Sequence, residues 1–153
     1  SRRQRQMCIR DSFEAAQRNL QRADQAIAMA TMFLSEHIGL GGVVALTESG
    51  GTPRYLSRFR SNMPIYAFTR HDGARRQMAM MRGVFPIGFD SRGLTPREAA
   101  RAAIRLLVEN ERMGPGDRVV FTSGEHMETH GATNTLRLLE VGEDGRASGL
   151  GEL

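Results

Sequence analysis

Apolar residues recur every three or four positions near the start of the chain, which is the spacing of one face of an α-helix. Over residues 13–38 they include Leu20, Ile27, Leu34 and Ile38, with good helix-forming residues between them. Gly39 then breaks the pattern. One long helix that ends at Gly39 is therefore expected.

Short apolar runs separated by turn residues follow this helix, and each of them predicts a strand. A run of this length and composition is typical of a strand buried on both faces of a parallel sheet. The third run contains Pro86, which favours an edge strand or a strand end because proline donates no backbone hydrogen bond. The last run alternates apolar and polar residues, as a strand with one solvated face does. The five strands are expected at residues 43–46, 63–68, 84–87, 118–122 and 135–141.

Helices are expected between these strands, and two of them carry capping signals. Thr52 is followed by a proline, so Thr52 is expected to cap a short helix that runs to about Phe59. Thr95 is followed three residues later by Glu98, which is the pattern of a capping box. This second helix is expected to reach the turn at residues 114–116.

The alternation of strands and helices predicts an α/β fold. A further helix over residues 72–81, with Asp72 as its cap, completes the alternation. We expect a three-layer sandwich whose mostly parallel, mixed five-stranded sheet lies between helices. The domain is expected to span residues 13–142, with a polar, frayed tail at residues 143–153.

Residues 1–12 are expected to be a non-native or disordered leader. They have no apolar periodicity, and residues 6–12 resemble translated sequencing-adapter read-through. They also hold four arginines against one aspartate, a net charge of +3 out of the +4 of the whole chain. The remainder is nearly neutral, and all basic residues are arginine, as in a GC-rich coding sequence. A nucleic-acid partner is therefore not expected.

Composition narrows the class of protein further. With 153 residues, of which 40% are hydrophobic, the chain suits one domain with an ordinary core. No apolar run approaches the roughly 20 residues of a membrane span, and no signal-peptide stretch follows the first arginines. A cytoplasmic protein without a membrane partner is expected. The single cysteine, Cys8, excludes an intrachain disulfide framework and a cysteine-built zinc site.

Two loops are candidate ligand sites, because ligands of open α/β sheets bind where loops leave the carboxyl ends of strands. The first loop combines hydroxyl groups, glycines that allow a close backbone approach, and the start of a helix, which together suit a phosphate. It lacks the spacing and the lysine of the nucleotide-triphosphate P-loop. Spacing alone equally allows an ordinary turn that caps a helix. The loop consists of Thr47, Glu48, Ser49, Gly50, Gly51 and Thr52.

The second loop, residues 122–133, contains two histidines four positions apart. His126 and His130 have Glu125 and Glu128 nearby, which raises the hypothesis of a zinc site. The H-E-x-x-H order is absent, however, so a solvated loop is favoured and no metal site is expected. No Ser/His/Asp or Cys/His arrangement and no paired carboxylates are present. The sequence thus predicts a binding site and no catalytic residues.

Six stretches of the chain, taken in their order and spacing, resemble the carboxy-terminal domain of proteobacterial-type pyruvate kinases. The resemblance runs from about residue 23 to residue 141. It implies a parent enzyme that transfers a phosphoryl group from phosphoenolpyruvate to ADP in glycolysis, with Mg²⁺ and K⁺, in a (β/α)₈ barrel. The matching stretches are residues 45–50, 57–60, 64–70, 82–86, 116–120 and 131–137.

A (β/α)₈ barrel needs roughly 200 residues or more, so this chain is expected to lack it and to be inactive alone. The resemblance implies a regulatory fragment without a cofactor of its own. Its partners would be the rest of the pyruvate kinase chain and further copies in a homotetramer, with residues 15–38 near that contact. The alternative is a free-standing module of the same fold that binds a phosphorylated metabolite.

The resemblance also places the phosphate of an allosteric effector in the loop of residues 47–52. Gly124, Glu125, His126 and Gly131 of the later loop would close over it. Family members that bind fructose 1,6-bisphosphate often have a basic residue where this chain has Glu48, and tryptophan and arginine in the later loop. A monophosphate, such as AMP or a sugar monophosphate, is therefore the expected effector.

Overall fold

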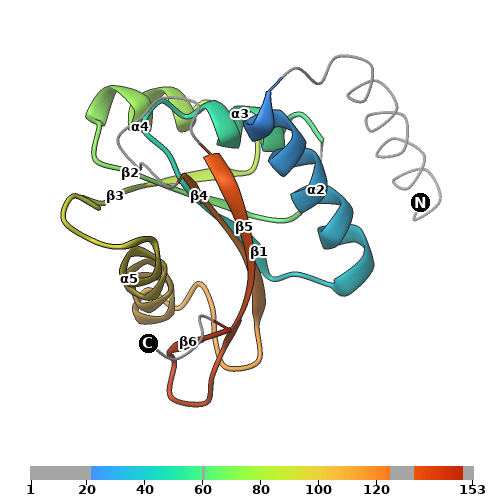
Figure 1. Cartoon of the computed structure of the whole chain (residues 1–153), viewed down its shortest axis with the longest axis vertical. Coiled ribbons are helices and arrows are strands. Elements are labelled where there is room, and N and C mark those ends of the chain that lie inside the picture. The colour runs from blue at the N-terminus through green and yellow to red at the C-terminus, as the bar shows by residue number, and fades with distance from the viewer. Residues whose placement is uncertain (1–21, 60, 125–132, 150–153) are drawn as a thin grey trace.

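A six-stranded sheet forms the centre of the molecule (Figure 1), as a computed structural model shows for residues 22–59, 61–124 and 133–149. The strand order is β3-β2-β1-β4-β5-β6. The helices are α2 (Ala23–Ile38), α3 (Gly51–Ser57), α4 (Asp72–Met78) and α5 (Pro96–Glu109). The strands are β1 (Gly42–Leu46), β2 (Ile65–Thr69), β3 (Val84–Gly88), β4 (Arg118–Gly124), β5 (Thr133–Val141) and β6 (Ala147–Ser148).

The sheet is mixed and mostly parallel, as the sequence predicts. Strand β1 pairs in parallel with β2 and with β4, and β2 pairs in parallel with β3. Strand β5 runs antiparallel to β4, and β6 runs antiparallel to β5. Strand β3 lies at one edge, which confirms the position expected from Pro86.

The expectation of five strands was wrong by one. Strand β6 has only two residues and lies in the segment expected to be a frayed tail. A tight turn brings it back to β5, with Gly142 N–H donating to the Arg146 carbonyl and Gly145 in the left-handed region at φ 74°. The Ser148 hydroxyl then donates to the Glu140 carbonyl. A two-residue strand is too short to show periodicity in the sequence, although Ala147 packs against the core layer under α5.

The core has two layers, one on each face of the sheet. Among the described helices, α5 covers one face, and α2, α3 and α4 cover the other (Figure 1). In β1, Val44 and Leu46 belong to the layer under α5, while Val43 belongs to the opposite layer. The central strands are buried on both faces, which explains their uninterrupted apolar runs. Small residues of α5 let it lie close to the sheet; they are Ala99, Ala100 and Ala103.

The helix boundaries follow the capping signals in part. The capping box of α5 is present, with the Thr95 hydroxyl accepting from Glu98 N–H at 3.2 Å and the Glu98 carboxylate accepting from Thr95 N–H at 2.7 Å. Helix α4 is capped by His71, so Asp72 is its first residue and not its cap, and the helix ends at Met78. Of the long helix expected over residues 13–38, the part from Ala23 is confirmed, and residues 13–21 lie outside the described residues, as does the leader.

Helix α3 starts earlier and ends earlier than predicted. It spans Gly51–Ser57, and its cap position is taken by Gly50 at φ 82°. Thr52 is therefore inside the first turn and is not the cap. Its hydroxyl instead lies 2.9 Å from the hydroxyl of Thr133 on β5, a partner 81 positions away that no local pattern reveals.

Replacing Thr95 by alanine is expected to lower the free energy of unfolding by about 1 kcal/mol, because the N–H group of Glu98 loses its acceptor. Urea unfolding followed by circular dichroism measures this loss. Thr95→Ser keeps the hydroxyl and is expected to unfold close to the unmodified chain. Equal midpoints for Thr95→Ala and the unmodified chain would show that the box contributes nothing.

Candidate functional site

The loop of residues 47–52 leaves the carboxyl end of β1, at the centre of the sheet. Thr47 N–H still donates to the Phe68 carbonyl of β2, at 3.0 Å. The chain then turns sharply, and Gly50 N–H donates to the Thr47 hydroxyl at 2.8 Å. A Cβ on Gly50 would lie 3.0 Å from Cγ of Met78. Gly50 is thus required both by its positive φ and by the close approach of α4.

The hydroxyls of the loop keep hydrogen-bonding capacity for a ligand. The Thr47 hydroxyl accepts one bond and retains its own proton to donate. Thr52 and Thr133 share one hydrogen bond, so one of the two hydroxyl protons remains available. Ser49 is exposed. Of the hydroxyl groups that the sequence singles out, Ser49 is thus exposed and Thr52 is buried against β5.

Glu48 does not face open solvent. Its side chain is 7% exposed, and its carboxylate contacts Nε2 of His71 and lies 3.5 Å from the guanidinium of Arg70. Both partners follow β2, the neighbouring strand. The negative charge of Glu48 is thus compensated within the fold, and the carboxylate is directed to these two side chains.

Asp24 is a second carboxylate beside the loop, and the sequence analysis missed it. It is 1% exposed, and its Oδ2 atom lies 4.0 Å from the position of a Cβ on Gly51. The guanidinium of Arg22 binds the same oxygen at 2.8 Å. A helix that begins at residue 13 would place Asp24 in its middle, whereas Asp24 lies in the first turn of α2.

Ser123 falls in the second candidate loop, residues 122–133, but no sequence pattern singles it out, and the structure places it in β4. It follows Thr122, which forms with Ala45 the last pair of the β1–β4 ladder. Ser123 therefore lies at the carboxyl ends of the strands, as the loop does. It is 1% exposed, and its hydroxyl has no hydrogen-bond partner within the described part of the chain. A buried hydroxyl without a partner costs free energy and is usually satisfied by a water molecule or a ligand.

The later loop can be placed only at its start. Gly124 is buried and ends β4. Glu125, His126 and Gly131 lie outside the described residues, as does His130, so the closing loop and the zinc hypothesis stay predictions. Among the residues that are described, no three histidine, cysteine or acidic side chains gather as metal ligands.

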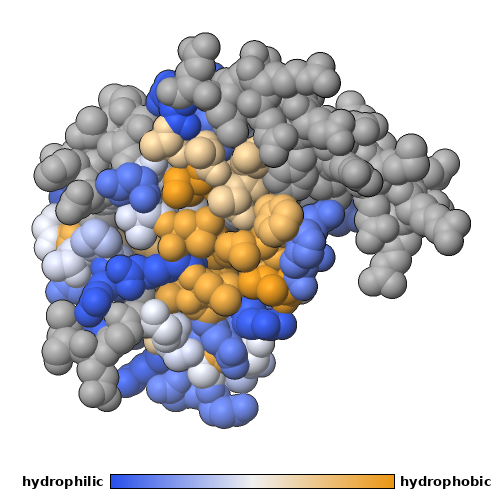
Figure 2. All heavy atoms as spheres, turned by 45° about the vertical axis from the view of Figure 1, so that its right-hand side comes forward, coloured by the Kyte–Doolittle hydropathy of each residue, from blue (hydrophilic) through white to orange (hydrophobic). Residues whose placement is uncertain are grey.

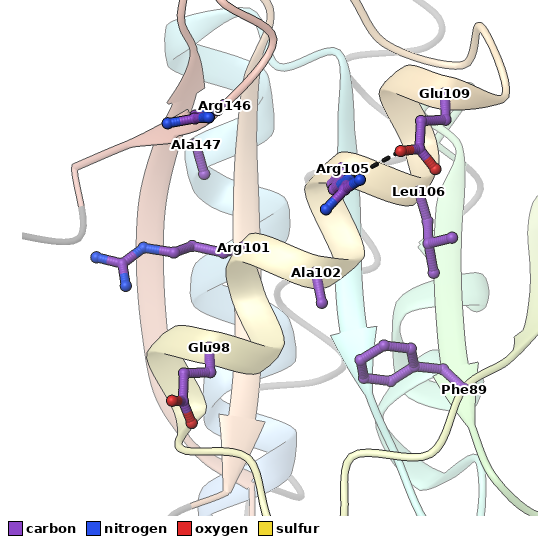
Figure 3. A pocket seen from close by; sticks show the side chains of 9 residues that line it. All are labelled: Phe89, Glu98, Arg101, Ala102, Arg105, Leu106, Glu109, Arg146 and Ala147. Carbon is purple, nitrogen blue, oxygen red and sulfur yellow. Dashed lines mark hydrogen bonds and ion pairs between the residues drawn. The ribbon is translucent and has the colours of Figure 1, made fainter.

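Two hollows are lined by residues outside this loop. A small pocket of about 350 Å³ lies by the carboxyl ends of β2 and β3 and is lined by Arg70, His71, Gly88, Phe89, Asp90 and Arg92. A larger hollow of about 930 Å³ follows α5 (Figure 3). Charged side chains surround an apolar floor there, and Arg105 and Glu109 pair at 2.8 Å. Its lining residues are Phe89, Glu98, Arg101, Ala102, Arg105, Leu106, Glu109, Arg146 and Ala147.

One face of the molecule is apolar. On the side that carries α2 and β5, hydrophobic residues form a continuous area between charged ones (Figure 2). Phe33 of α2 and Leu138 of β5 are large exposed hydrophobic residues, with 55% and 44% of their surface accessible. No helix in the described ranges is both long and apolar enough to cross a lipid bilayer.

Residues 25–139 match the family model described as the pyruvate kinase alpha/beta domain. The chain is 40% identical over 119 residues to pyruvate kinase II of Salmonella typhimurium, an alignment that covers 77% of this chain and 25% of that protein. It is 39% identical over 122 residues to a pyruvate kinase of Buchnera aphidicola subsp. Schizaphis graminum, an alignment that covers 79% of this chain and 25% of that protein. A pyruvate kinase of Staphylococcus saprophyticus is 32% identical to it over 127 residues, which are 82% of this chain and 22% of that protein. The chain thus spans about a quarter of the length of these relatives.

Gly50→Ala is expected to lower the free energy of unfolding by about 1–3 kcal/mol, because alanine is strained at this φ and meets Met78. Gly73→Ala is the matched control, since Gly73 lies in α4 with open space around it and should be neutral or stabilising by about 0.4–1 kcal/mol. Thermal unfolding of both variants measures the difference. Similar melting temperatures for the two would contradict the conformation assigned to Gly50.

The carboxyl group of Asp90 provides a test of the pocket by β2 and β3. Hydrogen bonds from the side chain and then from the backbone N–H of Arg92 lower the pKa of Asp90 to about 2. The pair therefore contributes to stability at neutral pH, and this contribution is lost as the pH falls through about 2. Arg92→Gln is expected to raise the pKa of Asp90 towards its ordinary value, and Arg76→Gln to leave it unchanged. An NMR titration of the carboxyl carbon measures both, and an unchanged pKa in Arg92→Gln would refute the pairing.

Proposed function

The chain belongs to the pyruvate kinase family as its carboxy-terminal α/β domain, and from this premise we propose that it is the regulatory and assembly domain of a longer pyruvate kinase. The phosphoryl transfer from phosphoenolpyruvate to ADP, with its Mg²⁺ and K⁺, would then take place in a separate catalytic barrel. Two facts support the proposal. The chain spans about a quarter of its relatives, and its described residues form an open sheet of six strands.

The regulatory part of the proposal places the phosphate of an effector at the carboxyl ends of β1 and β4. The observation that carries it is the buried hydroxyl of Ser123, which has no partner in the described ranges and lies at the same sheet edge as the tight glycine loop. A phosphate oxygen accepts hydrogen bonds from hydroxyl and backbone N–H groups alike. Ser49 and Thr52 offer hydroxyls from the loop of residues 47–52, and Ser123 offers one from β4.

The charges around the loop favour a ligand with one phosphate. Glu48 and Asp24 both lie beside the loop, and each has its own counter-ion, so neither presents an uncompensated charge to a ligand. The two arginines of these pairs, Arg22 and Arg70, are therefore offset by two carboxylates and add no net positive charge for a second phosphate. We expect AMP or a sugar monophosphate rather than a bisphosphate.

The assembly part of the proposal uses the apolar face over α2 and β5 (Figure 2). Phe33 and Leu138 expose apolar surface that a second copy of the chain would remove from water. Homo-oligomers are most often built from such self-complementary faces around a twofold axis. The homo-oligomer would therefore join through this face.

Calorimetric titration with AMP, ribose 5-phosphate, glucose 6-phosphate and fructose 1,6-bisphosphate tests the effector site. We expect a monophosphate to bind, and Ser49→Ala and Ser123→Ala each to weaken it about tenfold or more, because each removes a hydrogen bond to a charged group. Ser57→Ala is the control, since the Ser57 hydroxyl binds the Arg54 carbonyl at the other end of α3. Unchanged affinity in both variants would show that the phosphate does not bind in this loop.

A further inference from the structure

The pocket of about 350 Å³ beside β2 and β3 is a separate opening at the carboxyl edge of the sheet. Its walls come from Arg70 and His71, which directly follow β2, and from the segment that begins at Gly88, the last residue of β3. Ligands of open α/β sheets bind in crevices at this edge. A volume of this size holds a small organic molecule.

Arg70 has donor groups available towards this pocket. Its guanidinium is 3.5 Å from the Glu48 carboxylate, which is longer than the 2.7–3.2 Å of a good hydrogen bond. A guanidinium has five N–H donors, so one long ion pair uses little of its capacity. The Arg70 side chain is 28% exposed, which leaves it within reach of a dissolved ligand.

Arg75 adds a second guanidinium. Its side chain lies so close to Gly88, a residue of the pocket wall, that a Cβ on Gly88 would come within 2.6 Å of a terminal nitrogen. Its other terminal nitrogen binds Asp72 at 3.0 Å, which fixes the side chain in this position. The missing side chain at residue 88 therefore makes room for a guanidinium at the wall of the pocket.

The carboxylates near these cations are already in use. Arg92 binds both oxygens of Asp90, at 2.6–3.1 Å, and the Glu48 carboxylate contacts His71 and is almost fully buried. The groups left to meet a ligand are the guanidinium of Arg70, which lines the pocket, and the terminal nitrogen of Arg75 that lies against Gly88, with Phe89 as a further lining residue. Guanidinium groups bind carboxylate and phosphate oxygens in matching geometry.

We propose that this pocket is a second anion site, which binds the oxyanion of a small phosphate monoester or carboxylate through Arg70 and Arg75. The site shares no residue with the hydroxyl groups of the loop at residues 47–52, so it does not depend on the effector proposal. Glu48 links the two, because it belongs to the loop and its carboxylate also contacts His71 and pairs with Arg70. An anion that draws Arg70 away would change the surroundings of the loop.

Two-dimensional NMR of the full chain tests this proposal with inorganic phosphate and with malonate as probes. We expect at least one probe to shift the amide signals of Gly88 and Phe89 along a saturable curve. Arg70→Gln and Arg75→Gln should each raise the apparent Kd at these signals tenfold or more. Arg76→Gln, an exposed neighbour in the same helix, should change it less than twofold.

The two probes separate the two ligand classes, since malonate carries only carboxylates. The amides of Gly50 and Gly51 report on the loop in the same spectra, so failure of one site is distinguishable from failure of the other. Preserved dispersion of the spectra shows that each variant folds, and Arg70→Lys, which keeps the charge and loses the planar fork, should give an intermediate Kd. The proposal is overturned if neither probe shifts Gly88 and Phe89, or if both glutamine variants titrate like the unmodified chain.

Discussion

The burial of strand β1 on both faces is the constraint from which the rest of the fold follows. All five residues, Gly42–Leu46, are buried, and the strand pairs in parallel with β2 on one side and β4 on the other. Such a strand needs a helix layer above and below it, and parallel neighbours need crossover connections that supply those helices. With β3 parallel to β2 as well, the carboxyl ends of four parallel strands lie on one side of the sheet. The glycine loop, Ser123 and the Arg70 pocket all lie there because of this arrangement.

Sequence patterns predicted those parts of the fold whose causes are local. Apolar runs identified the five longer strands, and Thr95 with Glu98 identified the start of α5, since a capping box involves residues only three apart. Thr52 was wrongly expected to cap α3, because its actual partner, Thr133, reaches it only through the pairing of β5 in the sheet. The two-residue β6 escaped detection, since a strand of this length has no periodicity.

The chemistry of the loop was less predictable than its position. Read along the chain, Glu48 is an acid in the middle of a phosphate-type loop, and Asp24 is an ordinary polar residue of a helix. In the structure each is buried and held by a cationic side chain: Glu48 by Arg70 from another element, and Asp24 by Arg22 at the start of its own helix. Burial makes such compensation necessary, because an unpaired buried carboxylate is very costly. The charge that a site presents to a ligand thus depends on which side chains the fold brings together, and the spacing of residues within one segment does not predict it.

The two edges of the sheet have a consequence for how copies of this domain can associate. Phe89 N–H donates to the Thr69 carbonyl of β2. The backbone groups of successive residues in a parallel strand point to opposite sides, so the backbone of Pro86 faces the open edge of the sheet. Proline lacks the N–H group that an added strand would need there. The β3 edge is therefore a poor template for lengthening the sheet from one molecule to the next, which is a common route to aggregation of β-containing domains. At the opposite edge, the two-residue β6 pairs only with Glu140 and Val141 of β5, so among the described residues no strand lies beside the outer side of β5 over residues 133–139. Association of the sheets of two copies is thereby directed away from β3, and β5 is the strand whose outer side can still accept a partner.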